Sequence, residues 1–93
     1  MALFTVTRIV DGDTFEVNPG WKWQQQTGER VRPTAYDAPE MNTLAGQMTK
    51  DRVARLILGK QVELGSAYKV DRGRLVCDVF FNGKKLEEYF SRY

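Results

Sequence analysis

Turn signals divide this chain of 93 residues into short segments that are rich in strand-forming side chains. DGD at residues 11–13, DRG at 71–73 and NG at 82–83 are typical turn sequences. NPG at residues 18–20 is expected to end the second strand, and Pro33 to place its part of the third strand at an edge or a bulge. Strands are expected at residues 3–10, 14–17, 29–36, 61–70 and 74–81. Five such short strands expose their edges unless the sheet closes, which favours a small, strongly curved barrel.

A helix is expected between the third and fourth strands, because apolar residues recur there at helical intervals. Asn42 or Thr43 can cap its start, and Gly59 suits its end. A second, short helix is expected at residues 86–93. The expected core face of the first helix consists of Ala45, Met48, Val53, Leu56 and Ile57. The predicted class is therefore β-rich α+β, with a five-stranded barrel, one main helix and a short C-terminal helix in a single domain of residues 1–93.

The chain contains no histidine, and Cys77 is its single cysteine. Ser-His and Cys-His catalysis, histidine metal ligands, intramolecular disulfides and cysteine zinc clusters are therefore excluded. Acid–base chemistry is left to Asp, Glu, Lys, Arg, Tyr or metal-bound water. Cys77 lies in an apolar strand and is expected to be buried and inert. A single cysteine fits a cytoplasmic protein and equally an exported one without disulfides.

The net charge of +2 is too small to indicate a nucleic-acid partner by itself. No apolar run approaches the roughly 18 residues of a membrane-spanning helix, so no membrane partner is expected. The first ten residues lack a basic start and a cleavage site, which predicts a strand rather than a signal peptide. Lys69, Arg72, Lys84 and Lys85 are expected to be solvated.

Two acidic motifs end strands of the same predicted meander: DGDT at residues 11–14 and YDAPE at residues 36–40. Asp13, Asp37 and Glu40 are the oxygen donors expected to converge. At ~4 Å and an effective dielectric constant near 20, each pair of carboxylates repels by about 4 kcal/mol. A hard divalent cation with oxygen ligands would offset that repulsion.

The proline of YDAPE stiffens the corner and holds the Ala38 carbonyl as a further oxygen donor. The other interpretation of both motifs is structural. Asp-Gly is a common turn dipeptide, and Asp often precedes a proline-containing turn. Both interpretations are open from the residues alone.

Arg32 lies five residues before Asp37 on the same predicted strand, and Arg74 follows Gly73 at the start of the strand expected at residues 74–81. Arginine presents a planar fork of donors that matches phosphate oxygens. With a divalent cation and an acid, two arginines suit phosphoryl chemistry; singly, each is equally an ordinary strand residue. Trp21 and Trp23 share a strand face and either stack on nucleobases or pack against the core.

These pieces resemble the staphylococcal nuclease (thermonuclease-like) domain family. The resemblance rests on IVDGDTF at residues 9–15, ERVRPTAYDAPE at 29–40, the AGQ-led helix from Ala45, and VDRGRLVCDVFFNGKKL at 70–86. The pieces occur in the family's order and cover most of the chain. The resemblance implies an OB-fold barrel and a Ca²⁺-dependent phosphodiesterase that leaves 5′-hydroxyl and 3′-phosphate ends on DNA and RNA. Single-stranded nucleic acid is the expected partner, and Mg²⁺ or Mn²⁺ are alternative ions.

By position in these motifs, the resemblance implies that Asp13 and Asp37 bind Ca²⁺ directly, with the Ala38 carbonyl as a third ligand. Asp11 is implied to lie near the ion. Glu40 is implied to orient or deprotonate the attacking water.

The resemblance also implies that Arg32 and Arg74 clamp the phosphate and stabilise the five-coordinate transition state. The chain lacks the loop tyrosine of the family and its third helix, which carries the base-stacking tyrosines. Trp21 or Trp23 is a candidate replacement for that stacking. The alternative function is an inactive OB-fold module that binds nucleic acid or protein.

Overall fold

The computed structural model of the protein describes residues 3–34 and 43–89. In chain order its elements are β1 (Leu3–Asp11), β2 (Thr14–Trp23), β3 (Gln26–Pro33), α1 (Leu44–Ile57), β4 (Gln61–Asp71), β5 (Arg74–Phe81), β6 (Lys84–Lys85) and η1 (Leu86–Tyr89). The DGD, DRG and NG turn predictions are confirmed, since β1, β4 and β5 end at these sequences. The two-residue strand β6 was not predicted.

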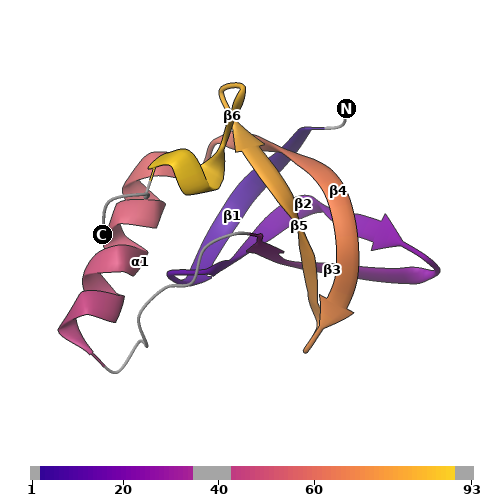
Figure 1. Cartoon of the computed structure of the whole chain (residues 1–93), viewed down its shortest axis with the longest axis horizontal. Coiled ribbons are helices and arrows are strands. Elements are labelled where there is room, and N and C mark those ends of the chain that lie inside the picture. Colours follow the sequence, from indigo (N-terminus) through magenta and orange to yellow (C-terminus); the bar gives the residue numbers. More distant parts are fainter. Residues whose placement is uncertain (1–2, 35–42, 90–93) are drawn as a thin grey trace.

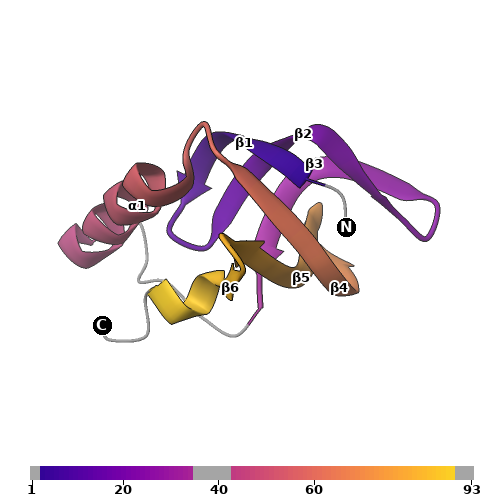
Figure 2. The same cartoon turned by 90° about the horizontal axis from the view of Figure 1, so that it is seen from above.

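The strands form a closed barrel (Figures 1 and 2). Antiparallel pairings join β3 to β2, β2 to β1, β1 to β4 and β4 to β5, and a parallel pairing of β5 with β3 closes the ring. β6 pairs with β5 outside the ring. This mostly antiparallel, OB-like barrel, with α1 between β3 and β4, confirms the predicted β-rich class. Because the barrel closes, each of its five strands pairs with a neighbouring strand on both sides over at least part of its length.

Alternate side chains along the strands point into the barrel and form one core. The strand residues of this core are Val6, Ile9, Phe15, Val17, Trp21, Val31, Val62, Leu75, Cys77, Val79 and Phe81. Val53 and Ile57 of α1 and Leu86 of η1 complete it. Cys77 is buried as predicted, and burial raises the pKa of its thiol to about 12, so the reactive thiolate is scarce at neutral pH.

Helix α1 lies beside the barrel, on the side away from the tip of the β2–β3 hairpin (Figures 1 and 2). Thr43 is its N-cap, and its side-chain oxygen accepts a hydrogen bond from the Gly46 amide at 3.0 Å. Gly59 follows the end of the helix with a φ of 78°, a conformation that glycine tolerates. Both boundary predictions are therefore confirmed.

The predicted core face of α1 is wrong in its first half. The buried residues are Gly46, Thr49, Val53 and Ile57. Met48 is 57% exposed, and Ala45 is exposed too. Val53 and Ile57 are the large apolar residues that α1 packs against the barrel. Residues three or four positions earlier share that face of the helix, and these are Thr49 and Gly46 rather than Met48.

The prediction that NPG ends β2 is wrong, because this sequence lies inside a strand that continues to Trp23. β1 pairs with β2 as far as Asn18. β3 pairs with β2 on both sides of the NPG sequence, at residues 15–16 and 21–23, with a register shift between Glu16 and Trp21. β3 begins at Gln26 rather than at residue 29. Pro33 is the last residue of β3 and is fully buried opposite Cys77, because the parallel pairing with β5 removes the expected edge.

The predicted C-terminal helix is not shown. Residues Leu86–Tyr89 form a 3-10 helix of four residues, and residues 90–93 lie outside the described part of the chain. Tyr89 still packs against the core, and its hydroxyl donates a 2.8 Å hydrogen bond to the Phe81 carbonyl. In the described ranges, neither the length nor the apolarity of any helix suffices to cross a bilayer.

Candidate functional site

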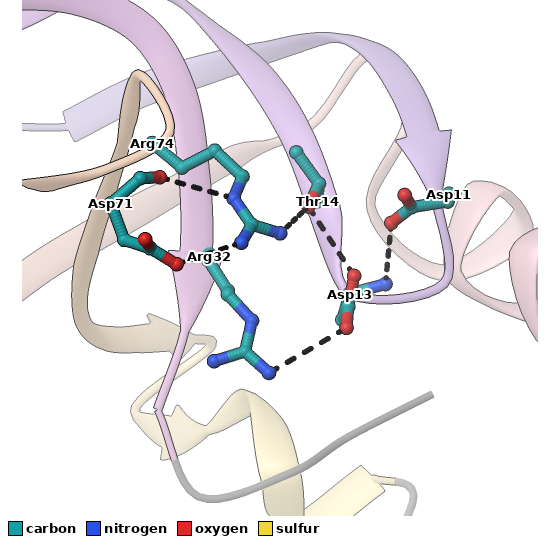
Figure 3. Close-up of polar contacts among 6 residues, drawn as sticks. All are labelled: Asp11, Asp13, Thr14, Arg32, Asp71 and Arg74. Atoms are coloured by element: carbon teal, nitrogen blue, oxygen red, sulfur yellow. Dashed lines mark hydrogen bonds and ion pairs between the residues drawn. The ribbon is translucent and has the colours of Figure 1, made fainter. Parts of the chain in front are cut away.

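Asp13 and Arg32 form an ion pair between the β1–β2 turn and the end of β3 (Figure 3). The distance from Arg32 Nη2 to Asp13 Oδ2 is 3.7 Å. The Arg32 side chain is 26% exposed and the Asp13 side chain 19%, so the pair is largely shielded from water. Shielding makes its electrostatic interaction stronger than that of a surface pair.

Arg74 joins the same network through Thr14 (Figure 3). Its Nη1 donates to Thr14 Oγ1 at 3.1 Å, and Thr14 Oγ1 donates to Asp13 Oδ1 at 3.3 Å. Asp71 holds the other side of the guanidinium, accepting from Nη2 at 3.1 Å and, through its carbonyl, from Nε at 3.3 Å. With Arg32, five residues from three separate parts of the chain thus form one network of hydrogen bonds and ion pairs.

The strand register explains why the two arginines meet. Arg32 lies between Val31 and Pro33, which are both buried, so its side chain points out of the barrel. In the parallel pairing of β3 with β5, Arg30 stands opposite Arg74 and Arg32 is one outward position further along. Closing the barrel therefore places both guanidiniums on one outer face, beside the β1–β2 turn that carries Asp13.

Asp13 has a raised pKa. Burial is the largest cause, and the hydrogen bond and negative charge of Asp11 act in the same direction. Arg32 and Thr14 lower the pKa but do not reverse the shift. The two carboxylates are held together because the Asp13 amide donates to Asp11 Oδ1 at 3.1 Å. Ionised Asp13 is therefore in an unfavourable environment that added positive charge would relieve.

We expect Asp13→Asn to increase the free energy of unfolding at pH 7 in the presence of a chelator. With its pKa raised, folded Asp13 keeps its proton at pH values between the ordinary pKa of 3.8 and the raised pKa, where the unfolded chain has released it. This group's contribution to stability therefore falls as the pH rises through that window. Urea denaturation at pH 7 and near pH 3 measures the effect, and the gain should shrink at the lower pH.

Asp51→Asn is the matched control, because it removes one negative charge from an exposed position on α1. Its effect on stability should stay within about 0.5 kcal/mol. If Asp13→Asn instead destabilises the protein at pH 7, the ion pair with Arg32 outweighs burial and the charge of Asp11.

Only one of the predicted metal donors lies among the described residues. Asp13 lies in the network, whereas Asp37, Ala38 and Glu40 lie outside the described ranges. Within residues 3–34 and 43–89, no three His, Cys, Asp or Glu side chains are grouped in a way that could hold a metal ion. The donors present there, the carboxylates of Asp13 and Asp11, fit a hard cation in their chemistry, and their mutual repulsion fits a need for one.

The two tryptophans do not form an exposed stacking platform. Trp21 is 3% exposed, and its indole Nε1 donates a 2.7 Å hydrogen bond to the Arg30 carbonyl. Trp23 packs against the core. The core interpretation is therefore confirmed for Trp21. The positively charged residues Lys69, Arg72, Lys84 and Lys85 are exposed, as predicted.

Thr14 and Asp71 belong to the network although the sequence interpretation assigned them no role. Each is adjacent to a predicted site motif: Thr14 follows Asp13 in DGDT, and Asp71 precedes Arg74 by three residues. A nearby acid and hydroxyl are the partners that a partly buried arginine requires. That requirement is the signal that could have identified them.

A cleft of about 470 Å³ lies at the opposite end of the strands, lined by residues that include Leu3, Phe80 and Phe81. Its lining contains one carboxylate, Glu63, and neither of the arginines in the network. The chemistry is concentrated on the outer face of the barrel rather than in this cleft. Comparison with known proteins adds no family, since neither a family model nor a curated protein sequence matches the chain.

Proposed function

We propose that the protein is a divalent-metal-dependent phosphodiesterase that cleaves DNA, RNA or both, with Ca²⁺ as its expected ion. The observation that carries this proposal is the meeting of Asp13, Arg32 and Arg74 in one polar network. Two guanidiniums and a carboxylate of raised pKa suit an anionic substrate bound with a cation. The OB-like barrel and the matching motifs support an assignment to the staphylococcal nuclease family.

The two arginines are matched to a phosphodiester under attack. When the oxygen of water adds to phosphorus, negative charge grows on the phosphate oxygens, so donors aimed there stabilise the transition state more than the ground state. Arg32 and Arg74 project from paired strands, and their side chains are 26% and 18% exposed. Groups held in this way need little reorganisation when the charge develops.

The acidic residues would divide two roles. Asp13 would hold the cation together with Asp37 and the Ala38 carbonyl, and Glu40 would orient the attacking water or accept its proton. When bound, the cation would supply positive charge beside the phosphate. Cleavage of the bond between phosphorus and the 5′ oxygen would leave a 3′-phosphate on one fragment and a 5′-hydroxyl on the other.

The test uses single-stranded DNA and RNA oligonucleotides with Ca²⁺, and the same reactions with chelator. Cleavage is expected with Ca²⁺ and should stop when the ion is removed. The new 5′ ends should accept a phosphate from polynucleotide kinase without prior dephosphorylation. Asp13→Asn, purified in parallel, controls for contaminating nucleases. A folded sample that leaves both substrates intact in Ca²⁺, Mg²⁺ and Mn²⁺ would overturn the proposal.

A second candidate is an inactive OB-fold module that binds nucleic acid. It is favoured by the pairing of each arginine with a carboxylate of the chain, Arg32 with Asp13 and Arg74 with Asp71, an arrangement that is also typical of structural ion pairs. Oligonucleotide binding without turnover in any of the three ions would support this alternative.

A further inference from the structure

Tyr68 is the one exposed aromatic side chain within residues 3–34 and 43–89. It is 58% exposed, whereas the two tryptophans, for which base stacking was one of two interpretations, are buried or packed against the core. Tyr68 lies at an irregularity of β4, where the register with β5 shifts between Ala67 and Lys69. The shift leaves both Tyr68 and Lys69 exposed. The ring is therefore accessible to a ligand.

The ring of Tyr68 is held in place by its hydroxyl. This hydroxyl donates to Asp78 Oδ2 at 3.0 Å, and Asp78 Oδ1 accepts a hydrogen bond from the Thr34 hydroxyl. Thr34 is itself fixed, because its amide donates to the Cys77 carbonyl at 3.0 Å. The hydrogen bond from Thr34 is the largest influence that lowers the pKa of Asp78, which favours the ionised acceptor that both hydroxyls need.

This chain of hydrogen bonds lies on the same outer face as the candidate site. Arg32 of β3 stands opposite Val76 of β5, and Val76 stands opposite Lys69 of β4. Asp78 is two residues beyond Val76 on β5, and Thr34, directly after the end of β3, is two residues beyond Arg32 and continues the pairing through its amide. Residues two apart on a strand share a face. Across this face, Arg32, Val76 and Lys69 form one row from strand to strand. Thr34, Asp78 and the hydroxyl of Tyr68 form the neighbouring row.

The spacing of the two rows suits a strand of nucleic acid. Two strand spacings of ~4.8 Å separate β3 from β4, and Tyr68 is displaced along its strand by about one residue, ~3.4 Å, from the level of Arg32, so the backbones of Tyr68 and Arg32 are ~10 Å apart. The long side chains of Tyr68 and Arg32 can each extend toward the other, so the ring and the guanidinium can lie closer together than the two backbones. A polynucleotide with one phosphate at the arginines would therefore bring a base of a nearby nucleotide to the ring. Exposed Lys69 and Arg72 on the same strand and its turn would attract its backbone.

We propose that Tyr68 is a stacking platform for a nucleobase of the strand whose phosphate binds at Arg32 and Arg74, and that Asp78 fixes the orientation of its ring. Single-stranded binders use aromatic rings in this way because every base offers a flat face. The inference rests on nucleic acid being the ligand of the proposed function, and it names a contact of that same site.

The test is equilibrium binding of a fluorescent single-stranded oligonucleotide at low salt in EDTA, so that binding is measured without cleavage. Tyr68→Ala should weaken binding about 10-fold or more, within the range typical of one base–aromatic stack. Tyr68→Phe keeps the ring and should stay within about threefold of the wild type. Replacing one nucleotide at a time by an abasic unit should identify a position at which Tyr68→Ala has no further effect.

Met48→Ala is the matched control, because Met48 is a comparably exposed apolar side chain, 57% exposed, on α1. It should leave binding unchanged. The inference is overturned if Tyr68→Ala binds like the wild type, if the wild type does not bind at low salt, or if Tyr68→Phe loses as much affinity as Tyr68→Ala. The last result would assign the effect to the hydrogen bond with Asp78 rather than to the ring.

These outcomes separate the two proposals. Tyr68-dependent binding without cleavage in any divalent ion would leave the stacking platform standing and overturn the nuclease. Cleavage in Ca²⁺, together with binding that does not depend on Tyr68, would support the nuclease and overturn the stacking platform.

Discussion

Arg74→Lys should lower kcat/KM for oligonucleotide cleavage about 100-fold or more, because one positioned donor to a developing charge is worth that much in enzymes. The Arg74 guanidinium makes three hydrogen bonds at 3.1 to 3.3 Å: one to Thr14 and two to Asp71. Lysine keeps the positive charge but not the planar fork, so it cannot hold these partners and also face a phosphate. Initial rates over a range of substrate concentrations measure the loss.

Arg30→Lys is the control for this substitution. Arg30 stands directly opposite Arg74 in the β3–β5 pairing, but its side chain is 49% exposed and pairs with Glu16 at 3.3 Å. The same chemical change one position away should alter kcat/KM by no more than about twofold. Equal losses in the two variants would indicate that replacing any guanidinium on this face by an ammonium group lowers the rate. A wild-type rate in Arg74→Lys would contradict a direct contact of Arg74 with the phosphate.

Phe15→Ala should reduce the free energy of unfolding by about 3–5 kcal/mol, the cost of deleting a large buried side chain. Phe15 is completely buried, and it stands opposite Ile9 of β1 and Val31 of β3. Removing the ring leaves a cavity where these strands meet, next to Thr14 of the candidate site. Denaturation by urea, followed by circular dichroism, measures the change.

Phe15→Leu tests whether volume is the cause, since leucine refills much of the space and should recover most of the loss. Leu58→Ala is the surface control, because Leu58 is 47% exposed, and it should change stability by about 0.5 kcal/mol or less. A loss under about 1 kcal/mol in Phe15→Ala would mean that the barrel collapses around the cavity without cost.

The features best predicted from the sequence are those set by local chemistry. The side chain of Thr43 caps the start of α1, and Gly59 adopts a positive φ after its end because it has no side chain. Both boundaries therefore depend on the local residue alone. The DGD and DRG turns are local in the same sense. They also place Asp13 in the β1–β2 turn and Arg74 at the start of β5.

The features that could not be predicted depend on residues distant in sequence. Pro19 lies within β2 because β1 pairs with the strand as far as Asn18 and β3 pairs with it on both sides of the proline, and a local pattern contains neither partner. The sequence left Trp21 open between base stacking and core packing, and the hydrogen bond from its indole to the distant Arg30 carbonyl accompanies the buried position. The contact of Tyr68 with Asp78 depends on a register shift in β4, which no periodicity of the sequence indicates.

The parallel pairing of β3 with β5 has a consequence for when activity can arise. Thr34 and Asp78, which meet across it, are 44 residues apart along the chain, and such distant contacts form slowly and late. During synthesis, Arg74 leaves the ribosome only after the first three strands and α1 have been made. If the protein is a nuclease, the growing polypeptide is harmless to the messenger and ribosomal RNA around it until the last barrel strand has been added.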